Sequence, residues 1–291
     1  MLRALGNRVT IATGFEKESC DLLVALHARK SAPSVRRFKR RYPDRPVVTA
    51  LTGTDLYRDL PTSTTARQTL DLSDAVIVLH SHAVDELPPG LRSKTHVILQ
   101  SAVASKPLRL PRRPRTFDVC VLGHLRAVKD PFRAAYAVRR LPEKSRIRVR
   151  HVGRALSKTY ERRARAEERK NPRYHWLGER SRSRTLRVLT RSRLLVLSSR
   201  AEGGANAISE AVVQAVPVLA SRIPGNVGLL GEDYSGYFTT GDTSALRRLL
   251  ERAETDAEFY RGLKRHVVKL TPLFRPAREQ QSWQELLSTL A

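Results

Sequence analysis

The amino-acid sequence predicts an α/β fold built from two Rossmann-like domains whose parallel sheets face a cleft, and three observations support this prediction. The chain has 291 residues, of which 41% are hydrophobic, and this is enough to form two cores. Short apolar segments alternate with amphipathic helical segments almost from end to end, as in βαβ units. A stretch rich in Pro and Arg at residues 106–115 interrupts this alternation, which then begins again.

We expect an N-terminal domain at residues 1–105, a linker at 106–116 and a second domain at 117–276. A last helix, Ala277–Leu290 within residues 277–291, is expected to pack back on the first domain. The expected strands of the first domain are Arg8–Thr13, Asp21–His27, Pro46–Thr52, Ala75–His80 and His96–Gln100. Those of the second domain are Phe117–Gly123, Ile147–Gly153, Tyr174–Glu179, Leu194–Ser199 and Pro217–Arg222.

The first residues, Met1–Leu5, have the pattern of the last turn of an amphipathic helix that ends at Gly6. In a Rossmann-like domain such a helix follows a strand and a loop. We therefore expect the first domain to lack its first strand.

The composition argues against several classes of protein. The only cysteines are Cys20 and Cys120, and no Cys/His group has the spacing of zinc ligands, so neither a disulfide framework nor a zinc site is expected. No apolar run has the length of a membrane span and no secretory signal pattern is present, so the expected location is the cytoplasm.

The net charge of +26 is the unusual value in the composition. Most of the basic residues are Arg in helical segments such as Tyr160–Lys170 and Ser181–Arg193, where they either form solvated helix faces or bind an anionic partner. No nucleic-acid-binding module is recognisable, and 6% aromatic residues leave few side chains for base stacking. We expect no nucleic-acid partner, while peripheral contact of the basic faces with a membrane stays open.

A loop with two glycines follows the strand expected at Leu194–Ser199, and a helix at Ala207–Ala215 follows the loop. Ligands of parallel sheets bind at such carboxyl ends of strands. Gly203 and Gly204 allow the backbone to approach a ligand closely, and the helix N-terminus offers free N–H groups to a phosphate. This pattern is typical of an anion site.

Two glutamates, Glu202 and Glu210, flank the glycine loop. Carboxylates repel phosphate but accept hydrogen bonds from hydroxyl groups, so the pair suits sugar and ribose hydroxyls on either side of a diphosphate. Such a ligand is a nucleotide sugar. Alternatively, the glycines only form a turn, Asn206 caps the helix and Glu210 is a solvated helix residue.

Glu202 and Glu210 are separated by seven residues, and the string AVVQAVPVLAS (Ala211–Ser221), Gly225 and the pair Gly241-Asp242 follow them in order. This order resembles the donor domain of the GT-B glycosyltransferases, which include glycogen synthase and sucrose synthase, over residues 117–290. The resemblance implies a GT-B architecture in which Glu210 binds the donor ribose. It also implies that the sugar and the diphosphate contact Glu202, Gly203, Gly204, Ala205 and Asn206.

The same resemblance implies two cations after the first strand of the second domain, where they neutralise the leaving diphosphate. The family has an Arg and, five positions later, a Lys; the matching residues here are His124 and Lys129. Since histidine is charged only in part near pH 7, Arg126 is expected to take the role of the Arg. Gly123, His124 and Leu177 complete the expected donor-binding residues. Alternatively, Lys129-Asp130-Pro131 is an ordinary helix start.

Longer strings resemble a narrower group, the selenosugar synthases of selenoneine biosynthesis, over nearly the whole chain. That resemblance implies transfer of a sugar from a UDP-sugar, with UDP-N-acetylglucosamine expected, to the selenium of selenophosphate. The strings are LVALHARKSA (Leu23–Ala32), LTGTDLYRDL (Leu51–Leu60), LGHLRAVKDP (Leu122–Pro131), RYHWLGE (Arg173–Glu179), SSRAEGGAN (Ser198–Asn206) and GLLGEDYSGYF (Gly228–Phe238).

Residues after the first-domain strands suit a small phosphate-bearing acceptor. His27, Arg29 and Lys30 offer donor or cationic groups, and Thr52-Gly53-Thr54 offers hydroxyl and backbone N–H groups. Asp55 either orients or deprotonates the nucleophile, or is structural because a selenide is already anionic near neutral pH. The alternatives are a packed strand-end histidine at His27 and a turn with an Asp helix cap at Thr52–Asp55.

The expected enzyme is therefore a metal-independent hexosyltransferase without a cofactor, in which the UDP-sugar is a substrate. No Asp-x-Asp motif occurs, so Lys129, Arg126 and the helix N-terminus are expected to stabilise the departing diphosphate, with Glu202 and Asp55 as further catalytic residues. Two alternatives stay open. One is a glycosyltransferase for a glycan or lipid acceptor, and the other is a catalytically impaired nucleotide-sugar-binding protein.

Overall fold

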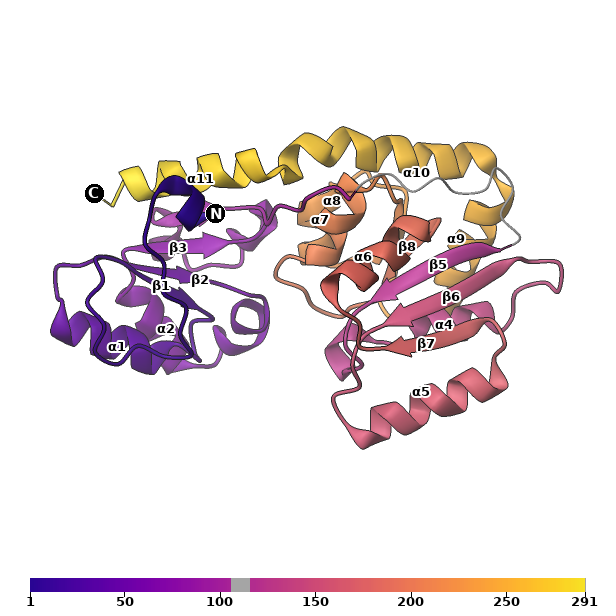
Figure 1. Cartoon of the computed structure of the whole chain (residues 1–291), viewed down its shortest axis with the longest axis horizontal. Coiled ribbons are helices and arrows are strands. Elements are labelled where there is room, and N and C mark those ends of the chain that lie inside the picture. Colours follow the sequence, from indigo (N-terminus) through magenta and orange to yellow (C-terminus); the bar gives the residue numbers. More distant parts are fainter. Residues whose placement is uncertain (106–115, 291) are drawn as a thin grey trace. The chain divides into compact units, whose positions relative to one another are not determined.

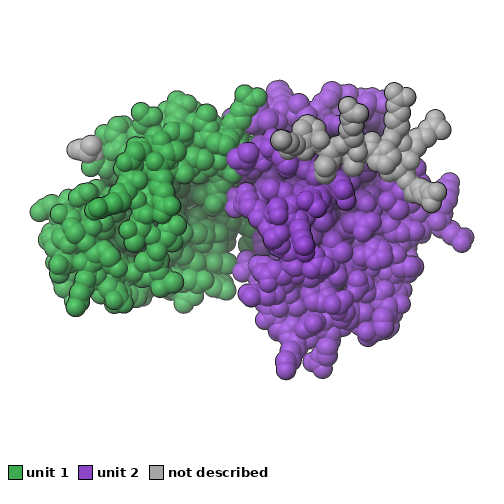
Figure 2. Space-filling view, in the orientation of Figure 1, with its two compact units in different colours: residues 1–101, 201–205, 273–291 green, residues 102–200, 206–272 purple. Residues whose placement is uncertain are grey.

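The computed structural model describes residues 1–105 and 116–290, and the chain divides into two compact units (Figures 1 and 2). Unit 1 contains Met1–Ser101, Ala201–Ala205 and Leu273–Ala291, and unit 2 contains Ala102–Arg200 and Asn206–Pro272. Of the expected linker at 106–116, all but Thr116 lies outside the described residues. Each unit has its own parallel sheet with helices, so the predicted α/β fold class is confirmed.

Unit 1 contains a four-stranded parallel sheet in the order β1-β2-β3-β4. Every residue of β2 and β3 is buried, as expected for central strands covered on both faces. The strands are β1 (Leu23–Leu26), β2 (Val47–Ala50), β3 (Ala75–Val78) and β4 (Thr95–Val97). The helices and helical turns are η1 (Leu2–Leu5), α1 (Ala32–Arg41), η2 (Asp55–Asp59), α2 (Thr64–Asp71), η3 (Ser81–Ala83), α3 (Pro89–Arg92) and α11 (Pro276–Ser288).

The two faces of this sheet pack against different helices (Figure 1). On one face, Val48 and Ile77 pack with the fully buried Leu286 of α11, and Trp283 is partly buried against the same cluster. On the other face, a second buried cluster includes Leu70 of α2. The last helix of the chain therefore completes the core of unit 1.

The strand expected at Arg8–Thr13 is wrong, because residues 7–13 have no regular structure. Ile11 is 86% exposed, and the carbonyl of Val9 accepts a hydrogen bond from the Arg3 guanidinium instead of a neighbouring strand. An extended segment without a partner strand gains neither a hydrogen-bond ladder nor a buried face. Three of the other four strands of the first domain form within the expected segments, whereas β4 (Thr95–Val97) starts one residue before the expected His96–Gln100 and ends three residues earlier. The turn η1 ends at Gly6, which has a φ of +85°.

Unit 2 contains a six-stranded parallel sheet in the order β10-β9-β8-β5-β6-β7. All five strands expected in this part of the chain form within the expected segments, and β10 adds a short edge strand. Because β5 and β8 are neighbours, the loops that follow them emerge side by side at the carboxyl end of the sheet. The strands are β5 (Phe117–Leu122), β6 (Ile147–Val152), β7 (Tyr174–Gly178), β8 (Leu194–Leu197), β9 (Val218–Ser221) and β10 (Tyr237–Phe238).

Side-chain caps mark the start of several helices of unit 2. The oxygens of Ser157, Ser181, Asp242 and Asp256 each accept a backbone N–H in the first turn of the following helix. Two of these caps explain why α5 and α6 start close to the helical segments expected at Tyr160–Lys170 and Ser181–Arg193. The helices and turns are η4 (Ala127–Lys129), α4 (Arg133–Val138), α5 (Lys158–Lys170), α6 (Arg182–Arg191), α7 (Asn206–Val213), α8 (Pro224–Leu230), α9 (Thr243–Thr255), α10 (Ala257–Leu270) and η5 (Thr271–Phe274), which runs into unit 1.

Within residues 1–105 and 116–290, none of the helices has the length and apolar character that a membrane crossing requires.

Replacement of Leu286 by Ala is expected to destabilise unit 1 by about 2–5 kcal/mol, because it leaves a cavity between α11 and the sheet. Amide hydrogen exchange of β2 and β3 should accelerate accordingly, while exchange of β5 and β8 should not change. Leu273→Ala is the control, because Leu273 is 43% exposed. Equal effects of the two variants on β2 and β3 would contradict the role assigned to α11.

Candidate functional site

The strand order of unit 2 reverses between β5 and β8. From β5 the chain continues to β6 on one side, whereas β8 leads to β9 on the other side. Loops that leave such a switch point diverge, and doubly wound sheets bind their ligands between them. The expected donor segments that begin at Gly123 and Ser198 both start at this point.

The turn that carries Lys129 is tied to the end of β8. The Ser198 hydroxyl lies 2.9 Å from the carbonyl oxygen of Asp130 and 3.3 Å from that of Lys129, and it donates to them. The N–H of Arg200 donates to the carbonyl of Val128 at 2.8 Å. Lys129 is thereby held at the carboxyl ends of β5 and β8, where it lines a narrow cavity.

The other two expected cations, His124 and Arg126, are exposed on the same turn. Nδ1 of His124 accepts the backbone N–H of Arg154 at 3.0 Å, so the neutral imidazole carries its proton on Nε2 and has one hydrogen bond to offer. The Arg126 guanidinium has no partner among the described residues, and it is charged at every physiological pH. These properties favour Arg126 as the permanent charge beside Lys129.

Below this loop lies a buried histidine that the sequence did not single out. Nε2 of His151 lies 3.0 Å from the carbonyl oxygen of Gly123 and donates to it, so Nδ1 accepts from the Tyr174 hydroxyl at 3.0 Å. Burial lowers the pKa of His151 to about 4, so the imidazole is neutral at pH 7. His151 thus positions the glycine of the loop without adding charge.

Glu210 lies on α7 with a side chain that is 14% exposed. Its Oε1 lies 3.3 Å from Nη2 of Arg182, the first residue of α6. Burial raises the pKa of the Glu210 carboxyl, and the charge of Arg182 opposes that rise. The second carboxyl oxygen has no partner among the described residues and is available to a hydroxyl donor.

The remaining residues of unit 2 that we expected to bind the donor are Leu177 and Asn206. Leu177 is half-buried in β7, and Asn206 is the exposed first residue of α7. Leu177 lines a different cavity from the one beside Lys129.

The segment Ala201–Ala205 belongs to unit 1, although β8 and α7 belong to unit 2. Its backbone lies against the loop after β2, because a Cβ on Gly203 would be 2.5 Å from Cα of Gly53. A Cβ on Gly204 would lie 2.5 Å from Cβ of Leu79. Close packing therefore requires these glycines, independently of any ligand, and Glu202 is half-buried in the same segment.

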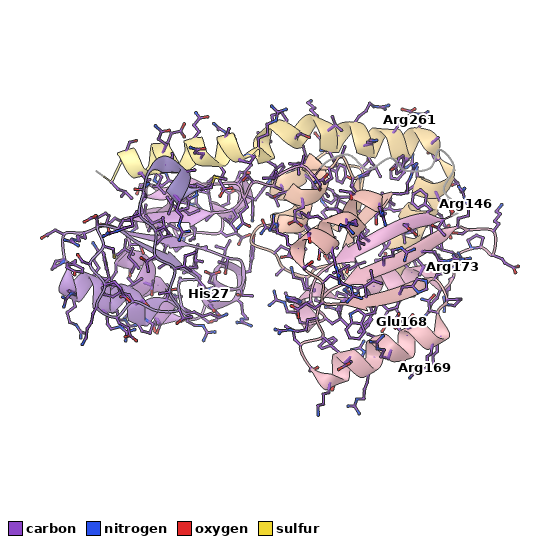
Figure 3. The ribbon with its side chains drawn as sticks, in the orientation of Figure 1. His27, Arg146, Glu168, Arg169, Arg173 and Arg261 are labelled. Atoms are coloured by element: carbon purple, nitrogen blue, oxygen red, sulfur yellow. The ribbon has the colours of Figure 1, made fainter. Side chains whose placement is uncertain are left out.

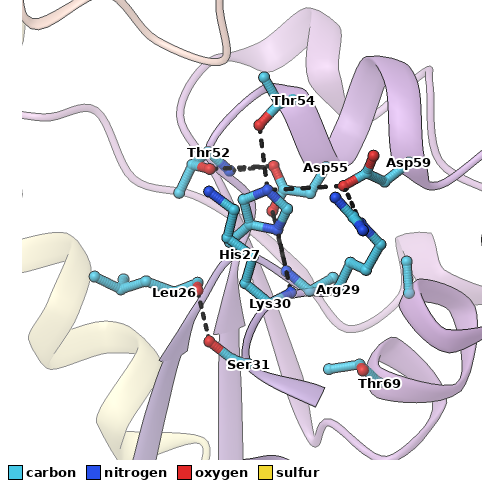
Figure 4. Close-up of polar contacts among 12 residues, drawn as sticks. Leu26, His27, Arg29, Lys30, Ser31, Thr52, Thr54, Asp55, Asp59 and Thr69 are labelled. Atoms are coloured by element: carbon cyan, nitrogen blue, oxygen red, sulfur yellow. Dashed lines mark hydrogen bonds and ion pairs between the residues drawn. The ribbon is translucent and has the colours of Figure 1, made fainter. Parts of the chain in front are cut away.

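His27 follows β1 directly and has a φ of +75°, which is unusual for a residue other than glycine and occurs often at functional sites. Its Nε2 lies 3.2 Å from the Thr54 hydroxyl oxygen. Each ring nitrogen lies 3.8 Å from one carboxylate, Nδ1 from Asp55 and Nε2 from Asp59 (Figure 4). The histidine is thus both packed at a strand end and surrounded by polar groups.

Asp55 is fully buried and bonded to three donors. Its Oδ1 accepts the backbone N–H of Thr52 at 2.8 Å and the hydroxyl of Thr52 at 3.2 Å. Its Oδ2 accepts the backbone N–H of Ala28 at 3.1 Å. These bonds join the loops after β1 and β2, so the geometry favours the structural alternative for Asp55 over a role as a base.

The other expected acceptor residues lie around the same two loops. Nε of Arg29 donates to Asp59 at 2.7 Å, and about half of the Arg29 side chain is exposed (Figure 4). Lys30 and Thr52 are exposed. Asp59 ends η2, a π-helical turn of a kind that is frequent at functional sites. The expected acceptor residues are therefore close together in unit 1.

The sequence also did not single out His80 of unit 1, a fully buried histidine that contacts the partly buried Tyr57. The Tyr57 hydroxyl lies 3.0 Å from Nε2 of His80, and the two rings are stacked. Burial lowers the pKa of His80 to about 4, and its Nδ1 is buried without a partner among the described residues. No spacing rule connects two residues on different loops, so the sequence carried no signal for this pair.

Residues 1–105 and 116–290 contain no group of three or more His, Cys, Asp or Glu side chains that could hold a metal ion.

Residues 106–267 match the family described as glycosyl transferases group 1. This is more than half of the chain, and the chain belongs to that family. No curated protein matched the sequence.

Solved structures of similar fold include the Anabaena protein HepE in complex with UDP and glucose, with a TM-score of 0.75 and 19% identity over 92% of this chain and 78% of HepE. Sucrose-phosphate synthase from Thermosynechococcus elongatus has a TM-score of 0.74 and 16% identity over 93% of this chain and 73% of its own. A glycosyltransferase from Rickettsia africae has a TM-score of 0.68 and 13% identity over 92% of this chain and 76% of its own. At these identities the likeness establishes the fold, and the expected GT-B architecture is consistent with it.

Gly203→Ala is expected to disrupt the packing of Ala201–Ala205 in unit 1, because its Cβ would overlap the backbone of Gly53. Amide exchange at residues 52–54 and 201–205 should rise at least about tenfold, corresponding to a loss of more than ~1.4 kcal/mol. Gly123→Ala is the control, since its Cβ would meet only the Lys129 side chain at 3.8 Å. Unchanged exchange in the Gly203 variant would show that the segment tolerates a side chain.

Proposed function

We propose that the chain is a hexosyltransferase that takes its sugar from a UDP-sugar. The observation that carries this proposal is the site at the switch point of unit 2. There the Gly123 loop, Lys129 and the acidic residue Glu210 of α7 are contributed by neighbouring strands of one sheet. Membership of the glycosyl transferases group 1 supports it, and HepE, a protein of the same fold, was solved with UDP and glucose.

In the proposed reaction, Glu210 accepts hydrogen bonds from the ribose hydroxyls. Its ion pair with Arg182 favours the ionised carboxylate, which is the stronger acceptor. Lys129 and Arg126 neutralise the diphosphate as the C1–O bond of the sugar breaks, and the N-terminus of α7 adds its dipole. The protein's own cations carry the developing charge, so we propose that no metal ion takes part.

We further propose that the acceptor is selenophosphate. Its selenium attacks C1 of the sugar, UDP leaves, and water then cleaves the P–Se bond to release phosphate and a selenosugar. His27, Arg29 and Lys30 supply donors and positive charge to the phosphoryl oxygens, and Thr52 and Thr54 supply hydroxyl groups. Asp55 holds their loops together rather than removing a proton.

Glu210→Ala is expected to weaken UDP binding about 10- to 100-fold, because charged hydrogen bonds to two hydroxyls are lost. Calorimetric titration of UDP into each variant measures this. Glu161→Ala is the matched control, since Glu161 is an exposed acid on α5. If the Glu210 variant bound UDP as tightly as wild type does, the ribose assignment would be wrong.

The acceptor is tested by mixing the purified chain with UDP-N-acetylglucosamine and selenophosphate. We expect release of UDP together with a selenium-linked sugar, detected by mass spectrometry. UDP release that occurs only with a glycan or lipid acceptor would reject selenophosphate while leaving UDP-sugar transfer intact. UDP binding without turnover on any acceptor would favour the catalytically impaired binding protein.

A further inference from the structure

We propose that unit 2 has a second anion-binding site, on the face of its sheet, for a small molecule that carries at least two phosphate groups. The site is a cavity of about 410 Å³ between strands β5–β7 and helix α6. This volume lies in the range of small-molecule sites, which is about 300–1,000 Å³. The proposal is independent of the reaction that we propose for the donor site.

Strand alternation explains where the cavity comes from. Val119, Val149 and Trp176 point to the buried face of the sheet, whereas Asp118, Arg150 and Leu177 point to the other face and are only half-buried. Helix α6 packs on β5 from this second face. The polar side of the three strands and one side of α6 therefore line the cavity, which is open to solvent on the side of the exposed arginines.

All the charged residues on the α6 side of the cavity are arginines. Arg184, Arg187 and Arg191 lie three and four positions apart and thus share one face of the helix, and Arg180 precedes the helix. No carboxylate of the described chain lies within ion-pair distance of any of these four guanidinium groups. The other arginine of α6, Arg182, is turned to Glu210 instead.

Arg150 contributes a fifth guanidinium from the floor, and its orientation is set by the protein. Its Nε donates to Oδ2 of Asp118 at 3.1 Å, while its two terminal nitrogens have no acceptor among the described residues. Among the described residues that line the cavity, Asp118 is the only acid, and its Oδ1 is buried without a partner in the described chain. The strands that line the cavity thus present the two terminal nitrogens of the Arg150 guanidinium as oriented hydrogen-bond donors.

Among the described lining residues, five guanidinium groups and one carboxylate give the cavity a net charge of +4 if all are ionised. Mutual repulsion of the guanidinium groups raises the free energy of the empty site, and a multivalent anion relieves it. Guanidinium groups fork onto phosphate oxygens in pairs, so five of them match more than one phosphate. Leu177 and Val188 add apolar surface, which suits a compact ligand rather than an extended polymer.

The cavity differs from the donor site in its residues and in its position on the sheet. Lys129, Gly123 and Ser198 line the small cavity at the carboxyl ends of the strands. None of these three residues lines the cavity between strands β5–β7 and α6. Asp118 lies near the start of β5, and Arg191 is the last residue of α6. Leu177 is the one residue that we also expect to contact the donor, so the test must separate the two sites.

The test is calorimetric titration of the full chain with inorganic tripolyphosphate while UDP saturates the donor site. We expect one binding event in wild type and at least a tenfold weaker affinity in the double variant Arg184→Gln/Arg187→Gln. Arg162→Gln/Arg169→Gln on α5 is the control, because it removes the same charge from arginines that are also exposed but do not line the cavity (Arg169 is labelled in Figure 3). Circular dichroism confirms that each variant is folded.

Three outcomes would overturn the proposal: no binding by wild type, equal losses in the two double variants, or displacement of tripolyphosphate by UDP. The second would indicate diffuse attraction by the net charge, and the third would make the cavity part of the donor site. Co-sedimentation with vesicles that contain a phosphoinositide bisphosphate identifies the source of the phosphate. Binding that depends on Arg184 and Arg187 would assign a lipid headgroup, and tripolyphosphate binding alone would assign a soluble ligand.

Discussion

The pairing of β5 with β8 is the constraint on which the candidate donor site depends. Val119, Cys120 and Val121 of β5 stand beside Leu194, Leu195 and Val196 of β8, and nearly all of these side chains are fully buried. Because strands that are distant in sequence become neighbours, the turn with Lys129 starts beside Ser198. Loss of this strand pairing would separate the turn that carries Lys129 from the loop that leads to α7, even if every loop residue were unchanged.

Much of this fold follows from the sequence because the strands are short, apolar and separated by capped helices. Parallel strands covered on both faces leave a continuous apolar run, as in Leu194–Leu197, and Ser181 or Asp242 marks the start of the next helix. The segment Arg8–Thr13 is rich in β-branched residues, which favour strands, but it has no regular structure in the described chain, and composition alone does not reveal a missing partner strand.

The candidate site was only partly predictable, for a similar reason. Residues that follow strands, such as Lys129 and His27, are visible in the sequence because the carboxyl ends of parallel strands share one edge. His151, His80 and Arg182 contribute through contacts made in three dimensions, and no sequence spacing encodes those contacts. The structural role of Asp55 could not be predicted either, because its three hydrogen-bond donors come from two loops that are distant in the sequence.

The large excess of arginine is distributed among several roles. Arg139 pairs with Glu167 and Arg133 with Asp130, so part of the charge is neutralised within unit 2. Other guanidinium groups cover aromatic rings, for example Arg165 over Trp176 at 4.7 Å. The arginines of α6 differ from these in that Arg184, Arg187 and Arg191 line a cavity.

The hydrogen bond from His151 to the carbonyl of Gly123 has a consequence for the polarity of the loop. In a trans peptide the C=O and the N–H point in opposite directions. With the carbonyl of Gly123 directed at the buried imidazole, the N–H of His124 is directed away from it. A peptide flipped the other way would present a partial negative charge to an approaching phosphate, so a neutral side chain inside unit 2 determines the sign of the dipole at the end of β5.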